Sequence, residues 1–384
     1  MSGTIYLDNA ATSFPKPQSV AREVAKCIEN YCGNSGRGSH KLSLLAANKI
    51  YDCREAVSRL VGVDLPENII FTPSCTYGLN LIIKGCLQAG DHVLISDMEH
   101  NAVFRPLYKL KREGLITYDT FPSLSNTKIS DEKLIFEIEK RLRRNTRLII
   151  CNHQSNICSY SLPLKKIGAL CKREGIGLVV DAAQSVGHLD IDMRDMNISF
   201  LSAAGHKGLY GPQGSAFVAI NSNRLLKTLV EGGVGIHSLD NDMPLDLPER
   251  YEAGTMPLPS IVGLHEGLKF VEHCTLEGIR AHEQMLFCYA REKLLNMDGV
   301  KVYLPEFEGS TILFNLEDAS AEQVGEFLDR ENICVRAGFH CSALAHRALG
   351  TIETGAVRAS FGAFNSKRDI DRLVDAINAF NQNK

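Results

Sequence analysis

Hydrophobic and polar residues follow one another along the chain in blocks that predict strands and helices in turn. From Asn68 onward, short apolar runs typical of buried strands are followed by stretches with helical spacing. The predicted strands occupy residues 69–71, 92–95, 147–150, 177–180 and 198–203, and the helices that follow three of them begin near residues 75, 101 and 164. Strands that alternate with helices predict an α/β fold with a mainly parallel sheet covered on both faces.

Two helices are expected before this alternation begins. A short strand is predicted near residues 6–8 and a helix over residues 19–32, and apolar residues at intervals of three and four predict an amphipathic helix over residues 46–61. The glycine-rich loop between the helices contains Arg37 and His40. These two side chains either line a site or belong to a solvated linker.

The alternation stops at a loop rich in aspartate and proline within residues 235–257. Beyond it we expect an α+β unit of two helices, a strand near residues 311–314, and further helices and strands. The predicted division is an N-terminal segment 1–16 associated with the small domain, a large domain 17–256 and a small domain 257–384.

The composition limits the classes of protein to which this chain can belong. Hydrophobic residues make up 44% and charged residues 23% of the 384 residues, values typical of a globular protein. A formal net charge of −3 gives no general attraction to nucleic acid or to anionic membranes. No stretch resembles a signal peptide or a membrane span, so a cytoplasmic location is expected. The twelve cysteines form no Cys-x-x-Cys pair and no zinc-site spacing, so no metal is expected and most should be small core residues.

One lysine stands out because glycines surround it. Lys207 follows a predicted buried strand, and glycines occupy positions 205, 208, 211 and 214. A desolvated lysine has a lowered pKa and can form a Schiff base with a carbonyl compound. An exposed loop lysine beside a Gly-Pro turn explains this stretch equally well.

Pyridoxal 5′-phosphate (PLP) supplies such a carbonyl group, and it requires three further protein groups. Asp181 directly follows a predicted strand and is placed to keep the pyridine nitrogen protonated, or to cap a helix. Ser74, Cys75 and Thr76 follow another strand and could bind a phosphate at a helix N-terminus, although such residues cap helices everywhere. His100 could stack on the cofactor ring, or be an ordinary polar loop residue.

Several motifs together resemble one family. Asp181-Ala-Ala-Gln184 and Gly205-His-Lys-Gly208, followed by Tyr210-Gly-Pro-Gln-Gly214, resemble the class V aminotransferase-fold PLP enzymes, in particular the cysteine desulfurase and selenocysteine lyase group. The remaining motifs appear in the family's order: Leu7-Asp-Asn-Ala-Ala-Thr12, Arg37-Gly-Ser-His40, Phe71-Thr72, Glu99-His100, Tyr251-Glu-Ala-Gly-Thr255, Arg336-Ala-Gly-Phe-His-Cys341 and Val357-Arg-Ala-Ser360. The resemblance implies the PLP-dependent transferase fold, similar to aspartate aminotransferase, with a large domain and a smaller C-terminal α+β domain.

The resemblance also implies roles for individual residues. Lys207 would form the Schiff base, Asp181 would pair with the pyridinium nitrogen, Gln184 would bond the phenolic oxygen, and His100 would stack on the ring and assist proton transfer. The phosphate would be held by Cys75, Thr76 and His206, with Thr255 reaching it from the partner subunit of a homodimer. The substrate would meet Ala10, Asn156 and Arg358, and a guanidinium is the natural bidentate partner of a carboxylate.

Cys341 determines the reaction that the resemblance implies. A thiolate at the matching position takes the sulfur of L-cysteine, which leaves a protein persulfide and releases L-alanine, and a sulfur-acceptor protein is then the expected partner. A thiolate is the reactive form of cysteine, and His340 and Arg336 could favour it. The alternative is an inert core cysteine. Cys341 lies 17 positions before Arg358, a spacing that resembles the subgroup whose cysteine sits on a compact, ordered lobe.

Two positions depart from the family's pattern. Ala204 stands where the family usually has a hydroxyl residue, and Ser202 either compensates for it or does not. Residues 74–77 replace the common Gly-Thr-Thr-Glu, so backbone donors to the phosphate are better supported than side-chain donors. The alternatives to a desulfurase are a selenocysteine lyase, another class V reaction (β-lyase, transaminase or epimerase), and a non-catalytic scaffold. The last is disfavoured because the whole set of site residues is present.

Overall fold

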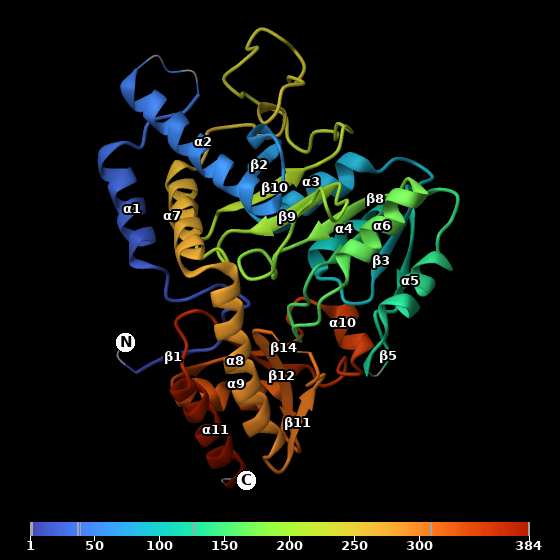
Figure 1. Cartoon of the computed structure of the whole chain (residues 1–384), viewed down its shortest axis with the longest axis vertical. Helices are drawn as coiled ribbons and strands as arrows, with labels where there is room; N and C mark the ends of the chain where they lie inside the picture. Colours follow the sequence, from blue (N-terminus) through green and yellow to red (C-terminus); the bar gives the residue numbers. More distant parts are fainter. Residues whose placement is uncertain (1–2, 37, 39, 126, 308, 383–384) are drawn as a thin grey trace.

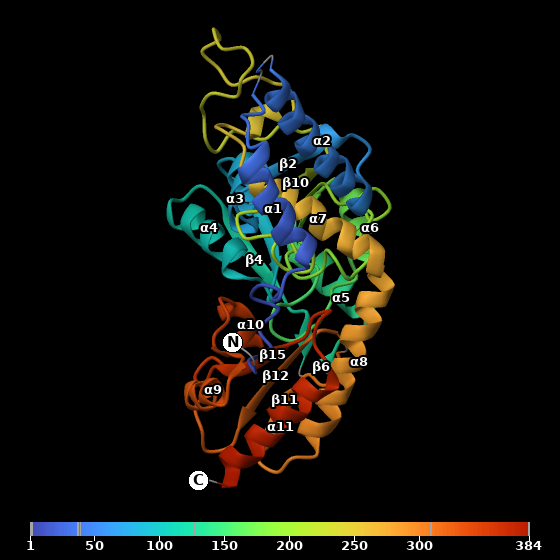
Figure 2. The same ribbon diagram turned by 90° about the vertical axis from the view of Figure 1, so that its left-hand side faces the viewer.

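The structure is a computed structural model that describes residues 3–36, 38, 40–125, 127–307 and 309–382. Figure 1 shows a large sheet with its helices in the upper part of the molecule and a smaller sheet with the last helices in the lower part. Helices α7 (Leu258–Cys274) and α8 (Leu276–Leu295) run one after the other from the upper part to the lower part, as the rotated view shows (Figure 2).

The large sheet has seven strands, and all but one of them run in the same direction. Its order is β2 (Ile69–Thr72), β10 (Ala216–Ile220), β9 (Phe200–Ala204), β8 (Gly177–Asp181), β7 (Thr146–Asn152), β3 (His92–Ser96) and β4 (Thr117–Phe121). Only β10 is antiparallel to its neighbours β2 and β9. The predicted mainly parallel sheet is therefore confirmed.

Both faces of this sheet are covered, which explains why its central strands are apolar throughout. Leu178 and Val180 belong to one buried cluster and Val179 to the other, because successive side chains of a strand point to opposite faces. Helices around the sheet include α3 (Cys75–Cys86), α4 (Asn101–Arg112), α5 (Asp131–Glu139) and α6 (Leu164–Glu174). Helices α1 (Gln18–Asn30) and α2 (Lys41–Val61) pack against α7.

The smaller sheet is fully antiparallel. Its order is β11 (Val300–Tyr303), β12 (Thr311–Leu316), β15 (Ala356–Ser360) and β14 (Arg336–Gly338). A third buried cluster joins it to α8, α9 (Ala321–Arg330) and α11 (Lys367–Gln382), while the short helix α10 (Ala343–Ala348) follows Cys341. The N-terminal strand β1 (Ile5–Tyr6) pairs with β13 (Ile333–Cys334), so the chain's beginning lies beside its last third. A two-stranded hairpin, β5 (Leu124–Ser125) and β6 (Thr127–Lys128), completes the strands.

The predicted elements agree with the structure within a few residues, and the capping box at Ser320 and Gln323 is present. The sequence pattern did not predict α5, β4, β5, β6, β10 and β11. Strand β4 lies at an edge of the sheet and alternates little, because most of its residues are partly exposed. The division into domains stays a prediction, and α7, just beyond the expected boundary, packs on α1 and α2. In the described part of the chain, no helix is both long and apolar enough to cross a membrane.

Candidate active site

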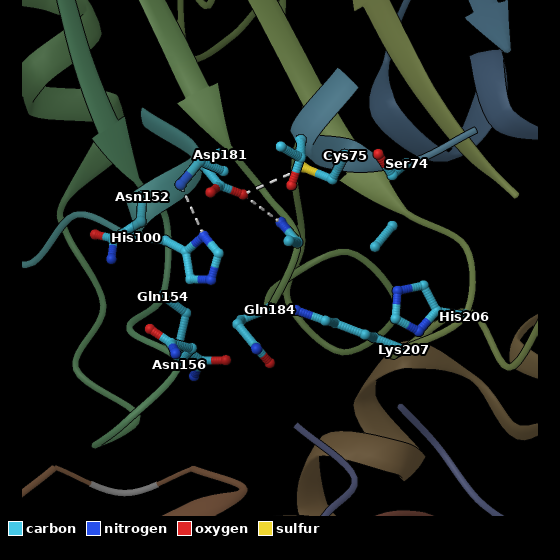
Figure 3. A pocket seen from close by; sticks show the side chains of 14 residues that line it. Ser74, Cys75, His100, Asn152, Gln154, Asn156, Asp181, Gln184, His206 and Lys207 are labelled. Carbon is cyan, nitrogen blue, oxygen red and sulfur yellow. Dashed lines mark hydrogen bonds between the residues drawn. The ribbon is translucent and has the colours of Figure 1, made fainter. Parts of the chain in front are cut away.

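A polar cavity of about 100 Å³ lies at the carboxyl ends of the parallel strands, as expected for an open α/β sheet. Its lining comes from the segments that follow β2, β3, β7, β8 and β9, so side chains from five separate parts of the sequence meet there (Figure 3). It contains seven residues predicted to bind the cofactor or substrate: Cys75, Thr76, His100, Asn156, Asp181, Gln184 and His206, together with Lys207.

Lys207 extends into this cavity toward Gln184 (Figure 3). Burial lowers the pKa of its ammonium group, an effect that the Asp181 carboxylate opposes, and no described residue accepts a hydrogen bond from Nζ. The N-terminal segment holds the backbone beside it. Ser13 Oγ donates to the Lys207 carbonyl at 2.9 Å, and Lys16 Nζ donates to the His206 carbonyl at 2.7 Å. Lys207 is thus a partly buried amine with a lowered pKa, and not an exposed loop lysine.

Asp181 ends strand β8 and is 5% exposed. Its Oδ1 accepts hydrogen bonds from the Ala183 amide at 3.0 Å and from Cys75 Sγ at 3.5 Å. Burial raises the pKa of the Cys75 thiol well above its ordinary value, so this group is a neutral donor. The Cys75 side chain is therefore engaged by Asp181, and its backbone amide is what remains for a phosphate.

One end of the cavity is formed by the N-terminus of α3. Ser74 caps this helix through its Oγ, which accepts from the Tyr77 amide at 3.1 Å, and the amides of Cys75 and Thr76 have no acceptor within the helix. His206 lines the same cavity, and its buried Nδ1 has no partner among the described residues. Burial, Lys207 and Lys16 lower the pKa of His206 to about 4. An uncharged N–H donor beside free helix amides fits a phosphate group.

His100 is held by its own helix. It precedes α4, and its Nδ1 accepts the Ala102 amide at 3.0 Å. Burial lowers the pKa of His100, although Asp181 opposes the shift. Because Nδ1 is an acceptor, the ring carries its proton on Nε2 when it is neutral.

Gln184 and Ala10 meet at the other side of Lys207. Gln184 Nε2 donates to the Ala10 carbonyl at 2.9 Å, and both residues line a small adjoining cavity with Lys207. Ser202 does not compensate for Ala204. Its buried hydroxyl lies 3.2 Å from the Cys75 carbonyl and 3.3 Å from the Phe217 carbonyl, whereas Ala204 lines the cavity.

Arg358 is 2% exposed and is held at two of its three nitrogens. Nη2 donates to Asp8 Oδ1 at 2.6 Å, and Nη1 donates to the Asn156 carbonyl at 2.9 Å. The Nε atom is buried and lacks a partner among the described residues. A buried guanidinium with one unsatisfied donor can still bind an oxygen of a carboxylate.

Cys341 is exposed, whereas seven of the twelve cysteines are buried, in line with the expected majority of core cysteines. It lines a second cavity, of about 330 Å³, which shares Thr76, His100 and Ala102 with the Lys207 cavity. Both His340 and Cys341 have left-handed backbones, with φ of 51° and 56°. This tight turn is held from outside: Asn101 N donates to the Cys341 carbonyl at 2.8 Å, and Asn156 Nδ2 donates to the His340 carbonyl at 2.9 Å.

The expectation that His340 favours a Cys341 thiolate is wrong. Burial lowers the pKa of His340 to about 3, so the ring carries no positive charge at neutral pH. Its Nε2 faces the Arg336 carbonyl at 3.1 Å and its Nδ1 faces His346 Nε2 at 3.1 Å, while His346 Nδ1 faces Thr351 Oγ1 at 2.7 Å. A carbonyl can only accept, so this chain of bonds is complete with both rings neutral.

Thr255 is not brought to the Lys207 cavity within one chain. It is exposed and lines a separate cavity of about 650 Å³ between α2 and the loop before α7. A buried, bidentate ion pair at 2.8 Å and 2.9 Å between Arg54 and Glu252 fixes this loop on α2. His40 caps α2, since its Nδ1 accepts from the Ser43 amide at 3.2 Å, and Arg37 lies outside the described residues.

Sequence reasoning assigned no role to three residues near the site. Asn152 and Gln154 line the Lys207 cavity, and only their position at the end of strand β7 signalled them. Glu99 is fully buried behind Asn152. The backbone N–H of Asn152 donates to Glu99 Oε1 at 2.8 Å, and Ser96 Oγ also donates to this oxygen. Burial raises the pKa of Glu99 to about 8, so this carboxyl is protonated at neutral pH.

Comparisons with known proteins identify a family and several similar chains. Residues 5–373 match the family described as Aminotransferase class-V. A protein of Halalkalibacterium halodurans described as a probable cysteine desulfurase is 31% identical, over 98% of this chain and 93% of its own length. A protein of Staphylococcus aureus (strain Mu50) with the same description is 31% identical over 97% and 91% of the two chains.

Solved structures share the fold. The apo structure of a cysteine desulfurase from Thermococcus onnurineus has a TM-score of 0.89 at 28% identity, and the match covers 99% of this chain and 95% of that one. The cysteine desulfurase CsdA of Escherichia coli has a TM-score of 0.87 at 23% identity, with 98% and 94% covered.

Proposed function

The chain belongs to the Aminotransferase class-V family, and from that premise we propose that it is a PLP-dependent cysteine desulfurase. It converts L-cysteine to L-alanine and keeps the sulfur on Cys341 as a persulfide. The observation that carries the proposal is that two neighbouring cavities share lining residues. One holds the free amine of Lys207 and the carboxylate of Asp181, the other holds the exposed thiol of Cys341, and both include Thr76 and His100.

The residues present fit the cofactor. Lys207 is the amine that would bind it covalently, Asp181 would pair with its ring nitrogen, and the orphaned Nδ1 of His206 would join the first amides of α3 at the phosphate. Gln184 still has a second amide proton for the phenolic oxygen. When bound, the cofactor withdraws electrons from the substrate and so makes its β-carbon lose sulfur readily.

The substrate is held by its carboxylate. Arg358 would bind this carboxylate through its guanidinium, which Asp8 and the Asn156 carbonyl keep oriented before the substrate arrives. Such preorganisation avoids reordering the side chain in the bound state. Ala10 lies beside Gln184 and Lys207, where it would limit the space around the substrate.

The remaining residues move protons and sulfur. His100, with Nδ1 held by Ala102, presents its Nε2 for proton transfer near the reacting atoms. The Cys341 thiolate attacks the substrate sulfur, the carbon–sulfur bond breaks, and the sulfur stays on Sγ as a persulfide. The carbon part takes up a proton and leaves as L-alanine. A thiol acceptor must then remove the outer sulfur, which requires a sulfur-acceptor partner.

A second copy of the chain completes the phosphate site in this proposal. Thr255 lies away from Lys207 in its own chain, and in this proposal it contacts the cofactor of the partner subunit. Apolar side chains of α2 are exposed in the single chain, namely Leu42, Leu44, Leu45 and Tyr51, and Tyr51 lines this cavity. These two features support a homodimer. The cytoplasmic location expected from the sequence stays a prediction.

One paired assay tests the proposed function. The purified protein should take up PLP and become yellow, and Lys207→Ala should lose the absorbance of the lysine-bound cofactor. With L-cysteine, wild type should release equal amounts of L-alanine and sulfide in the presence of a reductant, and Cys341→Ser should lose this activity. A protein that takes up no PLP contradicts the proposal. Selenide release that survives in Cys341→Ser, with cysteine turnover also unchanged, would favour the selenocysteine or simple lyase reaction instead.

A further inference from the structure

The cavity beside Cys341 is lined by three basic side chains, Lys84, Arg105 and Lys109, and by no acidic one among the described residues. Its two walls are stripes of residues one helical turn apart: Thr76, Asn80 and Lys84 on α3, and Ala102, Arg105 and Lys109 on α4. Residues spaced by three or four lie on one face of a helix. The two stripes therefore form the sides of one groove, with His100, Asn101 and Cys341 at its end.

No acidic residue balances this charge within the walls. Neither α3 nor α4 contains an aspartate or glutamate, while together they carry Lys84, Arg105, Lys109, Lys111 and Arg112, in a chain whose formal net charge is −3. Among the described residues, Lys84 and Arg105 form no ion pair, and Lys109 meets only Glu113, at 3.8 Å and at the far end of α4. The N-termini of both helices, which carry partial positive charge, lie at the Cys341 end.

The groove is too long for the amino-acid substrate alone. Thr76 and Lys84 are eight residues apart on one helix, a distance of about 12 Å along its axis. A stretch of that length accommodates three to four residues of an extended peptide, at about 3.3 Å per residue. A single cysteine molecule would reach only the Cys341 end.

We propose that the α3–α4 groove binds the sulfur acceptor, and that the acceptor is a protein segment whose thiol is flanked by carboxylates. This inference rests on the proposed function, because it needs the persulfide on Cys341. The acceptor thiolate attacks the outer sulfur of that persulfide and the bond between the two sulfurs breaks. The electron pair leaves with Cys341 Sγ as a thiolate, and the acceptor becomes the persulfide. No other oxidant or reductant takes part.

The test uses two acetylated pentapeptides, each with a central cysteine, in which the four flanking residues are all aspartate or all asparagine. Wild type is given L-cysteine without added thiol, and mass spectrometry confirms the persulfide on Cys341. The rate of sulfur transfer to each peptide is then measured at low salt and divided by the thiolate fraction of that peptide. We expect the aspartate peptide to react about tenfold faster or more, as charge complementarity does for association rates.

The preference for the aspartate peptide should disappear when the positive charge of the groove is removed. Lys84→Glu combined with Arg105→Glu should bring the two rates together, and so should high salt, which screens exposed charges. The control is Lys133→Glu combined with Arg368→Glu, two exposed residues outside the groove, because it changes the net charge equally. The control should keep the preference. Equal rates for both peptides on wild-type persulfide would overturn the inference while leaving the proposed function intact.

If no persulfide forms, the proposed function fails and the charge of the groove is tested by another route. Cys341 is alkylated with anionic iodoacetate and with neutral iodoacetamide, and the ratio of the two rates is compared between wild type and the groove variant. We expect the rate with iodoacetate divided by the rate with iodoacetamide to fall at least severalfold in the groove variant. The same ratio should stay at the wild-type value in the control. An unchanged ratio would overturn the inference by this route as well.

Discussion

Ser342 Oγ donates a hydrogen bond of 2.7 Å to Asn156 Oδ1, although the two residues are 186 positions apart in the chain. The other end of the same amide donates to the His340 carbonyl, so one side chain holds the turn on both sides of Cys341. The backbone carbonyl of Asn156 accepts from Arg358. Asn156 therefore links the residue proposed to bind the substrate carboxylate to the residue proposed to take its sulfur.

Ser342→Ala should loosen the Cys341 turn. The variant leaves the buried Asn156 Oδ1 without its donor, at a cost of about 1–2 kcal/mol. Since His340 and Cys341 already have left-handed backbones, we expect persulfide formation in a single turnover to slow about tenfold. PLP uptake should be unchanged. Ser320→Ala, which removes the cap of α9, is the control and should keep the wild-type rate. An unaltered rate in Ser342→Ala would show that the turn does not depend on this hydrogen bond.

Arg358→Lys should raise the KM for L-cysteine. Lysine keeps the charge but lacks the planar guanidinium that Asp8 and the Asn156 carbonyl hold, so the carboxylate would lose its oriented partner. We expect kcat/KM to fall about 100-fold, which corresponds to about 2.7 kcal/mol. The absorbance of bound PLP should persist. Arg330→Lys on α9 is a matched change at an exposed residue and should leave KM and kcat/KM unchanged. Wild-type KM in Arg358→Lys would remove this residue from the substrate site.

Glu99 should make stability depend on pH. Burial raises its pKa from an ordinary value of 4.5 to about 8, so the folded chain keeps a proton that the unfolded chain releases. The stability it contributes is fully present below pH 4.5 and is lost as the pH rises through about 8. Glu99→Gln has the shape of the protonated acid and keeps an oxygen for Ser96 and the Asn152 amide. The melting temperature of the variant minus that of wild type should therefore increase from pH 5 to pH 8. A constant difference across that range would contradict the raised pKa.

Thr255→Val should weaken PLP binding even though Thr255 is remote from Lys207 within one chain. The expected loss is about 1 kcal/mol for one missing hydrogen bond to the phosphate, or about fivefold in Kd. PLP titration monitored by absorbance, with light scattering to confirm the dimer, provides the measurement. Thr228→Val changes another hydroxyl residue of the preceding loop, one that bonds Glu231, and should leave Kd unchanged. An unchanged Kd in a dimeric Thr255→Val would exclude the residue from the phosphate site.

Much of the fold was predictable because the signals are local. Apolar runs bounded by turns identify the buried parallel strands, and the residues that follow them face the site because carboxyl ends of parallel strands share one edge. This is why Cys75, His100, Asp181 and Lys207 could be grouped from the sequence. Strand β10 could not be placed, since its antiparallel insertion between β2 and β9 depends on pairing between distant segments. Strand β4 was missed because an edge strand needs little apolar alternation.

The sequence by itself determined the elements, the order of the motifs and the chemical types of the site residues, because periodicity and side-chain chemistry are properties of neighbouring positions. Only the tertiary structure decided which of those groups remain free to react. It engages the Cys75 thiol with Asp181, keeps His340 neutral by burial, turns Asn156 toward the Cys341 loop, and leaves Arg358 Nε and His206 Nδ1 without described partners. Hydrogen-bond partners and desolvation come from residues far apart in the chain, so no local pattern can specify them.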